Sequence, residues 1–251
     1  MGVKGRWARL YVGEVDLSLK TSSAEVTIGV NTQETTAWQD TARTYIATDT
    51  EPQISINGYV DSLSTGGGGM EESLAAALGS TAGVMVGVLL QEAQSVDAGM
   101  PVYVFPATGG DSLSIGAPST GVLTISGAFP GGAGGIRRGL LLWRGSITAT
   151  GTKTAVDFAT AGAAGGDVYV FVHSITGTAT NAAIKVQSAS TSGGAYADEA
   201  TVTFSAKGTY SAAMTGAVDR WLRISTSSMG GATAFNVSVV ACVDGVTQPT
   251  Y

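Results

Sequence analysis

Two carboxylates lie close together near the start of the chain, in the stretch RLYVGEVDLS that runs from Arg9 to Ser18. Glu14 and Asp16 could act as a general acid and base, which requires an apolar pocket that raises the pKa of one carboxyl group. Nothing in the sequence specifies such a pocket or a substrate cleft. The pair is better interpreted as surface or channel-facing carboxylates of a protein that makes contacts.

The single histidine and the single cysteine add little chemistry. His173 closes the apolar run VYVFVHS and has no second histidine with which to share a metal ion. Cys242 lies in AFNVSVVACV, where a small thiol packs like an apolar residue, and one cysteine excludes an internal disulfide framework. We expect no catalytic centre, no metal and no cofactor, and we expect that the chain is not an enzyme.

Two glycine-rich stretches could in principle cradle a phosphate. They are STGGGG, before residue 70, and PGGAGGIRRG, which spans Pro130 to Gly139. A P-loop ends in Lys followed by Ser or Thr, and neither stretch does. The second stretch instead predicts a loop that becomes ordered against a neighbouring subunit, where Arg137 and Arg138 would meet carboxylates.

Composition favours a folded protein with a covered surface. Charged residues make up 13% of the 251 residues, about half of the usual share, whereas disorder goes with low hydrophobicity and high net charge. Contacts with neighbouring subunits would explain why so little charge is needed for solubility. The N-terminus has no signal-peptide pattern, and the apolar runs are too short to cross a bilayer.

Alternation of apolar and polar residues recurs along the chain and predicts an all-β fold, a sandwich or a barrel. One short helix near residues 70–79 interrupts it: Met70, Leu74 and Leu78 have helical spacing, and Gly79 follows as a stop. A loop-like stretch near Thr150 predicts two parts, residues 1–150 and 151–251. The second part would complete the sheet of the first or form a separate β-sandwich. The alternating runs are EVTIGV, QISINGYV, IKVQS, TVTFS and AFNVSVVACV.

Several of these runs resemble segments of the major tail proteins, or tail-tube proteins, of long-tailed, non-contractile bacteriophages. Near the N-terminus they are ARLYVGEVDLS, TARTY and EPQISINGYVDS, with a short helix after the Gly58–Asp61 turn. In the second half they are TGTKTAVDF, VYVFVHSITGT, IKVQSAS, TVTFSA and DRWLRIS. The resemblance covers most of the chain, and it implies a tail-tube-like β-barrel in residues 1–150 followed by a C-terminal β unit.

The resemblance also implies a structural role. Tail-tube subunits assemble into stacked rings, usually of six copies, which form the channel for the genome during ejection. The expected partners are other copies of the chain, the tape-measure protein and other tail proteins. Double-stranded DNA would pass through without specific binding, and no membrane would be involved. The expected location is the phage tail in the virion, after assembly in the host cytoplasm.

Charge is distributed unevenly along the chain. Between Thr21 and Asp111 there are eleven acidic residues and one basic residue. Acidic groups along a DNA channel would repel phosphates and let DNA slide, which makes channel-facing candidates of Glu34, Asp40 and Asp49. An acidic balance is also ordinary for a soluble protein.

Basic residues gather elsewhere and could meet the acidic surface of another copy. The expected assembly residues are Trp7, Arg9, Arg137 and Arg138. Two other functions stay open: a capsid decoration protein or other outer virion protein, and a carbohydrate-binding β-sandwich module. For the latter, Trp143 and Trp221 fall in strand-like runs where core packing is the expected role.

Overall fold

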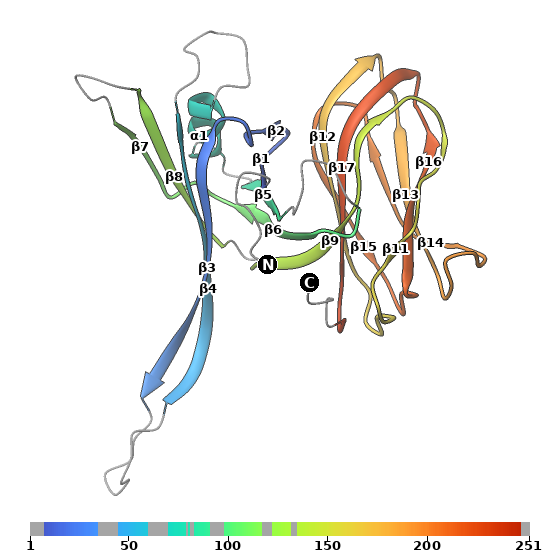
Figure 1. The fold of residues 1–251 in the computed structure, drawn as a ribbon, viewed down its shortest axis with the longest axis horizontal. Helices are drawn as coiled ribbons and strands as arrows, with labels where there is room; N and C mark the ends of the chain where they lie inside the picture. Colours follow the sequence, from blue (N-terminus) through green and yellow to red (C-terminus); the bar gives the residue numbers. More distant parts are fainter. Residues whose placement is uncertain are drawn as a thin grey trace, which may run out of the picture. The chain divides into compact units, whose positions relative to one another are not determined.

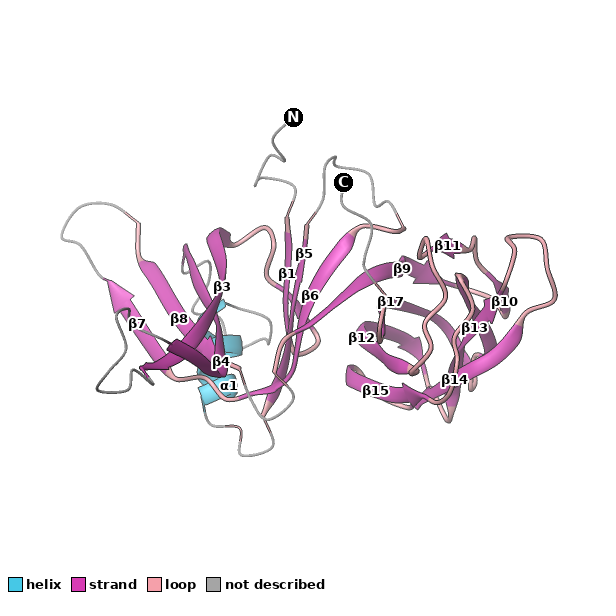
Figure 2. Cartoon of the chain, turned by 90° about the horizontal axis from the view of Figure 1, so that it is seen from below, coloured by secondary structure: helices cyan, strands magenta, loops and turns pink. Residues whose placement is uncertain are grey.

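The structure is a computed structural model that describes residues 8–34, 45–59, 70–78, 80, 83–90, 98–116, 122–131 and 135–246. The chain forms two compact units that are not consecutive in sequence. Unit 1 comprises Met1–Ser18, Gly87–Val104 and Arg137–Tyr251, and unit 2 comprises Leu19–Val86 and Phe105–Ile136. The described residues are mostly strands, with a single helix among them (Figures 1 and 2).

Two sheets carry most of unit 1. The larger has eight strands in the spatial order β15 (Gly208–Met214), β12 (Gly166–Gly177), β17 (Ala232–Val243), β9 (Arg137–Ile147), β6 (Pro101–Thr108), β5 (Val84–Leu89), β1 (Arg9–Val12) and β2 (Val15–Asp16). The smaller has the order β10 (Gly151–Thr152), β16 (Trp221–Ser228), β13 (Ala182–Ala189) and β14 (Ala197–Phe204), and β11 (Val156–Asp157) also pairs with β16.

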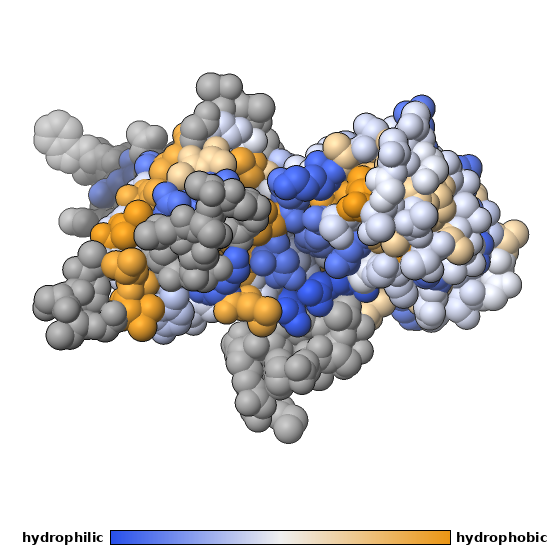
Figure 3. All heavy atoms as spheres, turned by 90° about the horizontal axis from the view of Figure 1, so that it is seen from above, coloured by the Kyte–Doolittle hydropathy of each residue, from blue (hydrophilic) through white to orange (hydrophobic). Residues whose placement is uncertain are grey.

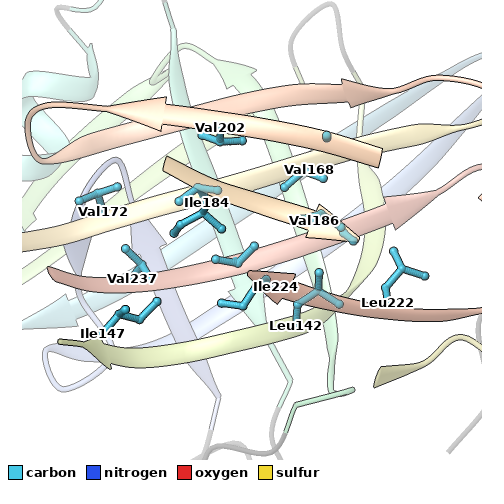
Figure 4. Close-up of a cluster of buried hydrophobic side chains, with 14 of the residues drawn as sticks. Leu142, Ile147, Val168, Val172, Ile184, Val186, Val202, Leu222, Ile224 and Val237 are labelled. Atoms are coloured by element: carbon cyan, nitrogen blue, oxygen red, sulfur yellow. The ribbon is translucent and has the colours of Figure 1, made fainter. Parts of the chain in front are cut away.

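The core of unit 1 lies between these two sheets. Alternate residues of each strand face inward, as the period of a strand requires, and most of them are β-branched or leucine. Figure 4 shows these side chains pointing toward one another from facing strands. They include Leu142, Ile147, Val168, Val172, Ile184, Val186, Val202, Leu222, Ile224 and Val237, all at 3% exposure or less.

The other face of β12 is also buried, because the N-terminal strand covers it. Tyr11 of β1 lies 5.3 Å from Phe171 and 5.0 Å from His173, measured between ring centroids. Gly87 of β5 lets the Phe171 ring approach, since a Cβ at this position would lie 2.9 Å from Cζ of that ring. The first strand of the chain is therefore part of the same unit as the last.

Unit 2 contains a four-stranded antiparallel sheet in the order β3 (Thr21–Glu34), β4 (Tyr45–Tyr59), β8 (Thr124–Pro130) and β7 (Ser112–Gly116). Its helix, α1 (Met70–Leu78), packs on β7 and β8 and buries Met70, Leu74 and Ala77. Two glycines of the sheet make room for it. A Cβ on Gly58 would lie 2.4 Å from Sδ of Met70, and one on Gly127 would lie 3.4 Å from the methyl groups of Leu74.

The all-β class with one short helix is confirmed, and the helix begins and ends close to where residue spacing predicts. The sheets of the described residues are open rather than closed barrels. The division into units differs from the expected boundary near Thr150. The reason is that β9 precedes this boundary yet pairs with β17 along Phe235–Ala241, so the C-terminal strands complete a sheet begun by earlier ones.

We predict that Gly58→Ala destabilises unit 2 by about 1–3 kcal/mol, the usual cost of overpacking. The added methyl group would meet both Met70 Sδ and the backbone oxygen of Lys20, 2.5 Å away. Chemical denaturation would measure the change. Gly109→Ala is the matched control, because a Cβ there has nothing within 4 Å; equal stability of the two variants would contradict the packing described.

Candidate functional site: the four-stranded sheet of unit 2

Among the residues whose side chains the structure describes, the face of the four-stranded sheet opposite α1 is polar. The register places Ser23, Asn57, Ser126 and Ser114 in one row across the four strands. Asn57 Nδ2 donates to Ser23 Oγ at 3.2 Å within this row. Other members of this polar face whose side chains the structure describes are Glu25, Thr27, Gln53, Ser55, Tyr59, Thr124, Ala128, Pro130 and Ser112.

Charged side chains are few among the described members of this polar face. Glu25 is its one charged member among the residues whose side chains the structure describes, and none of them is lysine or arginine. Hydroxyl and amide groups hydrogen-bond to water and keep a surface hydrated, but they do not bind ions strongly. Such a face offers nothing that would hold a phosphate by charge.

The helix side of the same sheet is only partly covered. Ile54, Ile56 and Phe129 are buried there, with 1% exposure or less. Toward the β3 edge the same face carries Val26, which is half-buried, and Ile28, which is 50% exposed. This face therefore leaves apolar side chains uncovered beyond the reach of α1.

Exposed large apolar side chains are concentrated in unit 2. Figure 3 shows hydrophobic side chains gathered on the part of the molecule that carries this sheet. Exposed apolar side chains in such number can mark contact sites. In unit 2 the exposed members are Leu19, Ile28, Tyr59, Leu78, Ile115, Val122 and Leu123, whereas among the described residues of unit 1 there is Leu90 alone.

Both edges of the sheet are open within the described part of the chain. β3 forms one edge and β7 the other. Natural edges are usually protected by lysine, proline or bulges. β3 contains neither lysine nor proline, and its register shifts lie near its ends, at Thr21/Ser23 and Asn31/Thr32. The middle of β3 is thus a regular edge with backbone groups free to pair.

Two of the three expected channel-facing acids lie in the β3–β4 pair. Glu34 is exposed at the end of β3, opposite Tyr45 of β4. Asp49 lies in β4 opposite Asn31. Asp40 lies outside the described residues. The channel-facing role of these acids stays a prediction. The polar face of hydroxyls and amides was not among the predicted sites, although the alternation of polar residues in QISINGYV indicated it.

The expected assembly residues have different surroundings. Trp7 lies outside the described residues, and Arg9 begins β1 in a half-buried position. Arg137 is bound within its own chain: its Nη2 lies 2.7 Å from Asp244 Oδ1 and 3.0 Å from Asp167 Oδ2. A contact of Arg137 with carboxylates of an adjacent subunit stays a prediction. Arg138 lies next to it in β9, opposite Tyr103 of β6.

The side chains of Glu14 and Asp16 form ion pairs and hydrogen bonds that hold the N-terminal strands in unit 1. Asp16 Oδ2 accepts from Arg144 Nη2 at 3.0 Å, and Asp16 Oδ1 accepts from the backbone amide of Ser18 at 3.0 Å. Glu14 Oε1 lies 3.4 Å from Lys207 Nζ. Each carboxylate faces a cation rather than an apolar pocket, which fits structural groups and not an acid–base pair.

His173 of β12 contacts the turn between β1 and β2, which contains Glu14. Its Nδ1 lies 2.8 Å from the Glu14 carbonyl oxygen, and its Nε2 lies 3.0 Å from Ser238 Oγ. A carbonyl only accepts, so Nδ1 carries the proton and Nε2 accepts from the serine hydroxyl. The register of β12 against β17 shifts at this residue, and such a bulge re-aims a side chain. Burial lowers the pKa of His173.

Cys242 is a core residue, as its sequence context predicts. It is 2% exposed, and burial raises the pKa of its thiol to about 12. Among the described residues, no group of three or more His, Cys, Asp or Glu side chains is arranged to hold a metal ion. No helix within the described ranges is long and apolar enough to cross a membrane.

Comparisons with known proteins give low similarity throughout. No family model and no curated protein matches the sequence. A chain from the virion of a native gene transfer agent particle is 11% identical, with a TM-score of 0.39, over 53% of this chain and 95% of its own length. A chain from the tube-terminating cap of the anti-feeding prophage is 13% identical, with a TM-score of 0.42, over 55% and 91%.

A third solved structure matches over more of the chain. The Dit protein of SPP1, described as a hub of the adsorption apparatus in phages that infect Gram-positive bacteria, covers 93% of this chain and 98% of its own. Its identity is 10% and its TM-score is 0.34. Similarity at these levels does not assign this chain a family or a function.

We predict that acidification weakens unit 1 through His173. Its folded pKa lies below the unfolded value of about 6.5, so the unfolded state binds the proton first and stability falls as pH drops through that value. The loss between pH 7.5 and 5.5 should reach up to about 1.4 kcal/mol. Denaturation at both pH values would measure it.

His173→Gln is the variant that isolates this effect, because an amide can replace both hydrogen bonds and does not titrate. His173 is the sole histidine of the chain, so no other imidazole contributes. The loss on acidification should be smaller in the variant. An identical loss in both proteins would show that the pKa of His173 is the same in the folded and unfolded states, and it would contradict the buried position described.

Proposed function

We propose that this chain is a non-catalytic structural subunit of a phage tail-type tube that assembles from copies of itself and conducts DNA. The observation that carries the proposal is the polar face of the four-stranded sheet, which has hydroxyls, amides and a single carboxylate but no cation among its described side chains. That face would line the channel, and α1 would lie on the outer side of the sheet.

The open edges supply the means of assembly. β3 and β7 are different strands at opposite ends of the sheet, so pairing β7 of one copy with β3 of the next is a head-to-tail contact. Contacts of this type close into rings or continue as helical filaments. Repetition around a ring would join the sheets of neighbouring copies and remove both edges.

The lining explains how DNA could pass. Affinity for DNA arises largely from cations that neutralise phosphates and release counterions. A wall without lysine or arginine gives no such gain, and Glu25 together with the expected acids Glu34, Asp40 and Asp49 would repel the phosphates. DNA would therefore slide through the channel rather than bind to it.

The sequence resemblance adds the finer features of the proposal. It favours rings of six copies in the tail of a non-contractile phage, with the tape-measure protein and other tail proteins as further partners. Assembly would take place in the host cytoplasm and the product would be part of the virion. A capsid decoration protein is the alternative, and it would form small closed oligomers rather than tubes.

Assembly should depend on the uncovered apolar side chains of β3. We predict that Ile28→Asp leaves the subunit folded, because Ile28 is 50% exposed, but prevents its assembly, because the new carboxylate would be buried against the next copy. Sedimentation and negative-stain microscopy would measure the loss of rings or tubes.

Thr27→Asp is the matched control for this test. Thr27 is adjacent in sequence, exposed, and on the polar face, so the same charge there should leave assembly intact. Equal assembly of both variants would contradict the interface, and compact oligomers of the parent protein in place of tubes would favour the capsid decoration protein.

Cations placed on the polar face should retard DNA. We predict that Ser55→Lys combined with Ser126→Lys leaves tubes intact but slows DNA release from particles by tenfold or more, with the delay relieved by salt. Ser190→Lys with Thr215→Lys adds the same charge at exposed positions of unit 1 and should leave release unchanged. Normal release from the first variant would exclude this face as the channel wall.

A further inference from the structure

The outer face of the five-stranded sheet of unit 1 carries an ordered set of polar and aromatic side chains. Leu222 and Ile224 of β16 point into the core, so Trp221 and Arg223 between and beside them lie on the outer face. Arg223 lies opposite Gln187 of β13. This outer face differs from the polar face of unit 2 in having charged and aromatic groups.

Arg223 is held in one orientation by two neighbours. Its Nε donates to Gln187 Oε1 at 3.0 Å, and its guanidinium carbon lies 3.7 Å from the centroid of the Tyr196 ring. Gln187 is itself fixed, because its Nε2 donates to Asp198 Oδ1 at 2.7 Å. Stacking and a side-chain hydrogen bond thus fix the plane of the guanidinium group.

Unlike the other cations of this face, Arg223 has no carboxylate partner within the described part of the chain. Lys185 pairs with Asp198 at 2.5 Å, and Arg220 pairs with Asp157 through two hydrogen bonds of 2.6 Å. These pairs lower the pKa of both carboxyl groups, chiefly through the hydrogen bonds from Lys185 and Arg220. The two Nη groups of Arg223 remain as an oriented fork without an acceptor in the described residues.

An oriented guanidinium fork is suited to bidentate binding of a carboxylate or phosphate group. The side chains around Arg223 narrow the chemical class of the ligand further. Trp221, two residues away on the same face, is half-buried and offers part of an apolar ring. Thr201 and Ser225 flank Lys185 across the strands and offer hydroxyls.

From this geometry we propose that the outer face around Arg223 binds an acidic saccharide, one that carries a carboxylate or phosphate on a sugar chain. Arg223 takes the anionic group, and Gln187 and the hydroxyls bond the sugar hydroxyls, which donate and accept. Trp221 packs against the apolar side of a sugar ring. Nucleic acid fits less well, because the two ion pairs cancel and leave one uncompensated positive charge where a basic stripe is needed.

Binding of defined polymers to the full-length chain tests this proposal, and it does not depend on tube assembly. Calorimetry with oligogalacturonate and with a phosphodiester-linked teichoic-acid-type polymer distinguishes the two anionic groups. At least one of them should bind, and a neutral maltooligosaccharide of equal length should bind at least tenfold more weakly. Failure of both acidic polymers to bind would overturn the proposal.

Variants separate a built site from general attraction by charge. Arg223→Lys keeps the charge but loses the fork, and it should weaken binding at least tenfold without changing thermal unfolding. Lys207→Gln removes a positive charge elsewhere in unit 1, where Lys207 is 64% exposed, and it should leave affinity within twofold. Unchanged binding by Arg223→Lys, or equally tight binding of inorganic polyphosphate, would show that only charge is recognised and would contradict the proposal.

Discussion

Burial of the four-stranded sheet on one face is the constraint on which the proposed role depends. Met70 of α1 reaches the sheet because Gly58 presents no side chain, and Leu74 packs over Gly127. The opposite face carries hydroxyls and amides, and Glu25 is its one charged member among the described side chains. The same arrangement leaves apolar side chains such as Ile28 uncovered at the β3 edge. In the proposed assembly, contact with other copies would complete the burial of these side chains.

Unit 1 is stabilised in a different way: strands from near both ends of the chain, β1, β2 and β17, belong to one sheet. β1 covers the outer face of β12, and the turn after it is held by His173, Arg144 and Lys207. Its charges are largely paired within the unit, as Arg137 with Asp167 and Asp244 illustrates. The described residues of the two units thus differ: unit 2 exposes apolar side chains and sheet edges, whereas unit 1 buries a large core and has one guanidinium group, that of Arg223, without a carboxylate partner on its outer face.

Local features were predictable from the sequence, and long-range ones were not. Alternation in QISINGYV indicated both the buried Ile54 and Ile56 and the polar side of β4, and the spacing of Met70, Leu74 and Leu78 indicated α1. Strand pairing between β9 and β17 joins residues about a hundred positions apart. No local period encodes such pairing, so the sequence left open whether the strands after Thr150 complete the first sheet or form a separate β-sandwich. Trp221 was expected in the core, yet it is only half-buried, and the guanidinium carbon of Arg220 lies 5.7 Å from the centroid of its ring. The reason is that a period of two fixes which residues alternate but not which face of the strand points inward.

A reconstruction of the assembled protein by electron cryo-microscopy tests the central claim most directly. The account predicts a ring or tube in which Ser55 and Ser126 face the channel and β7 of each copy lies beside β3 of the next. Helix α1 should lie on the outer side of the sheet. A channel lined by α1 or by unit 1, or copies joined without contact between these two edges, would contradict it.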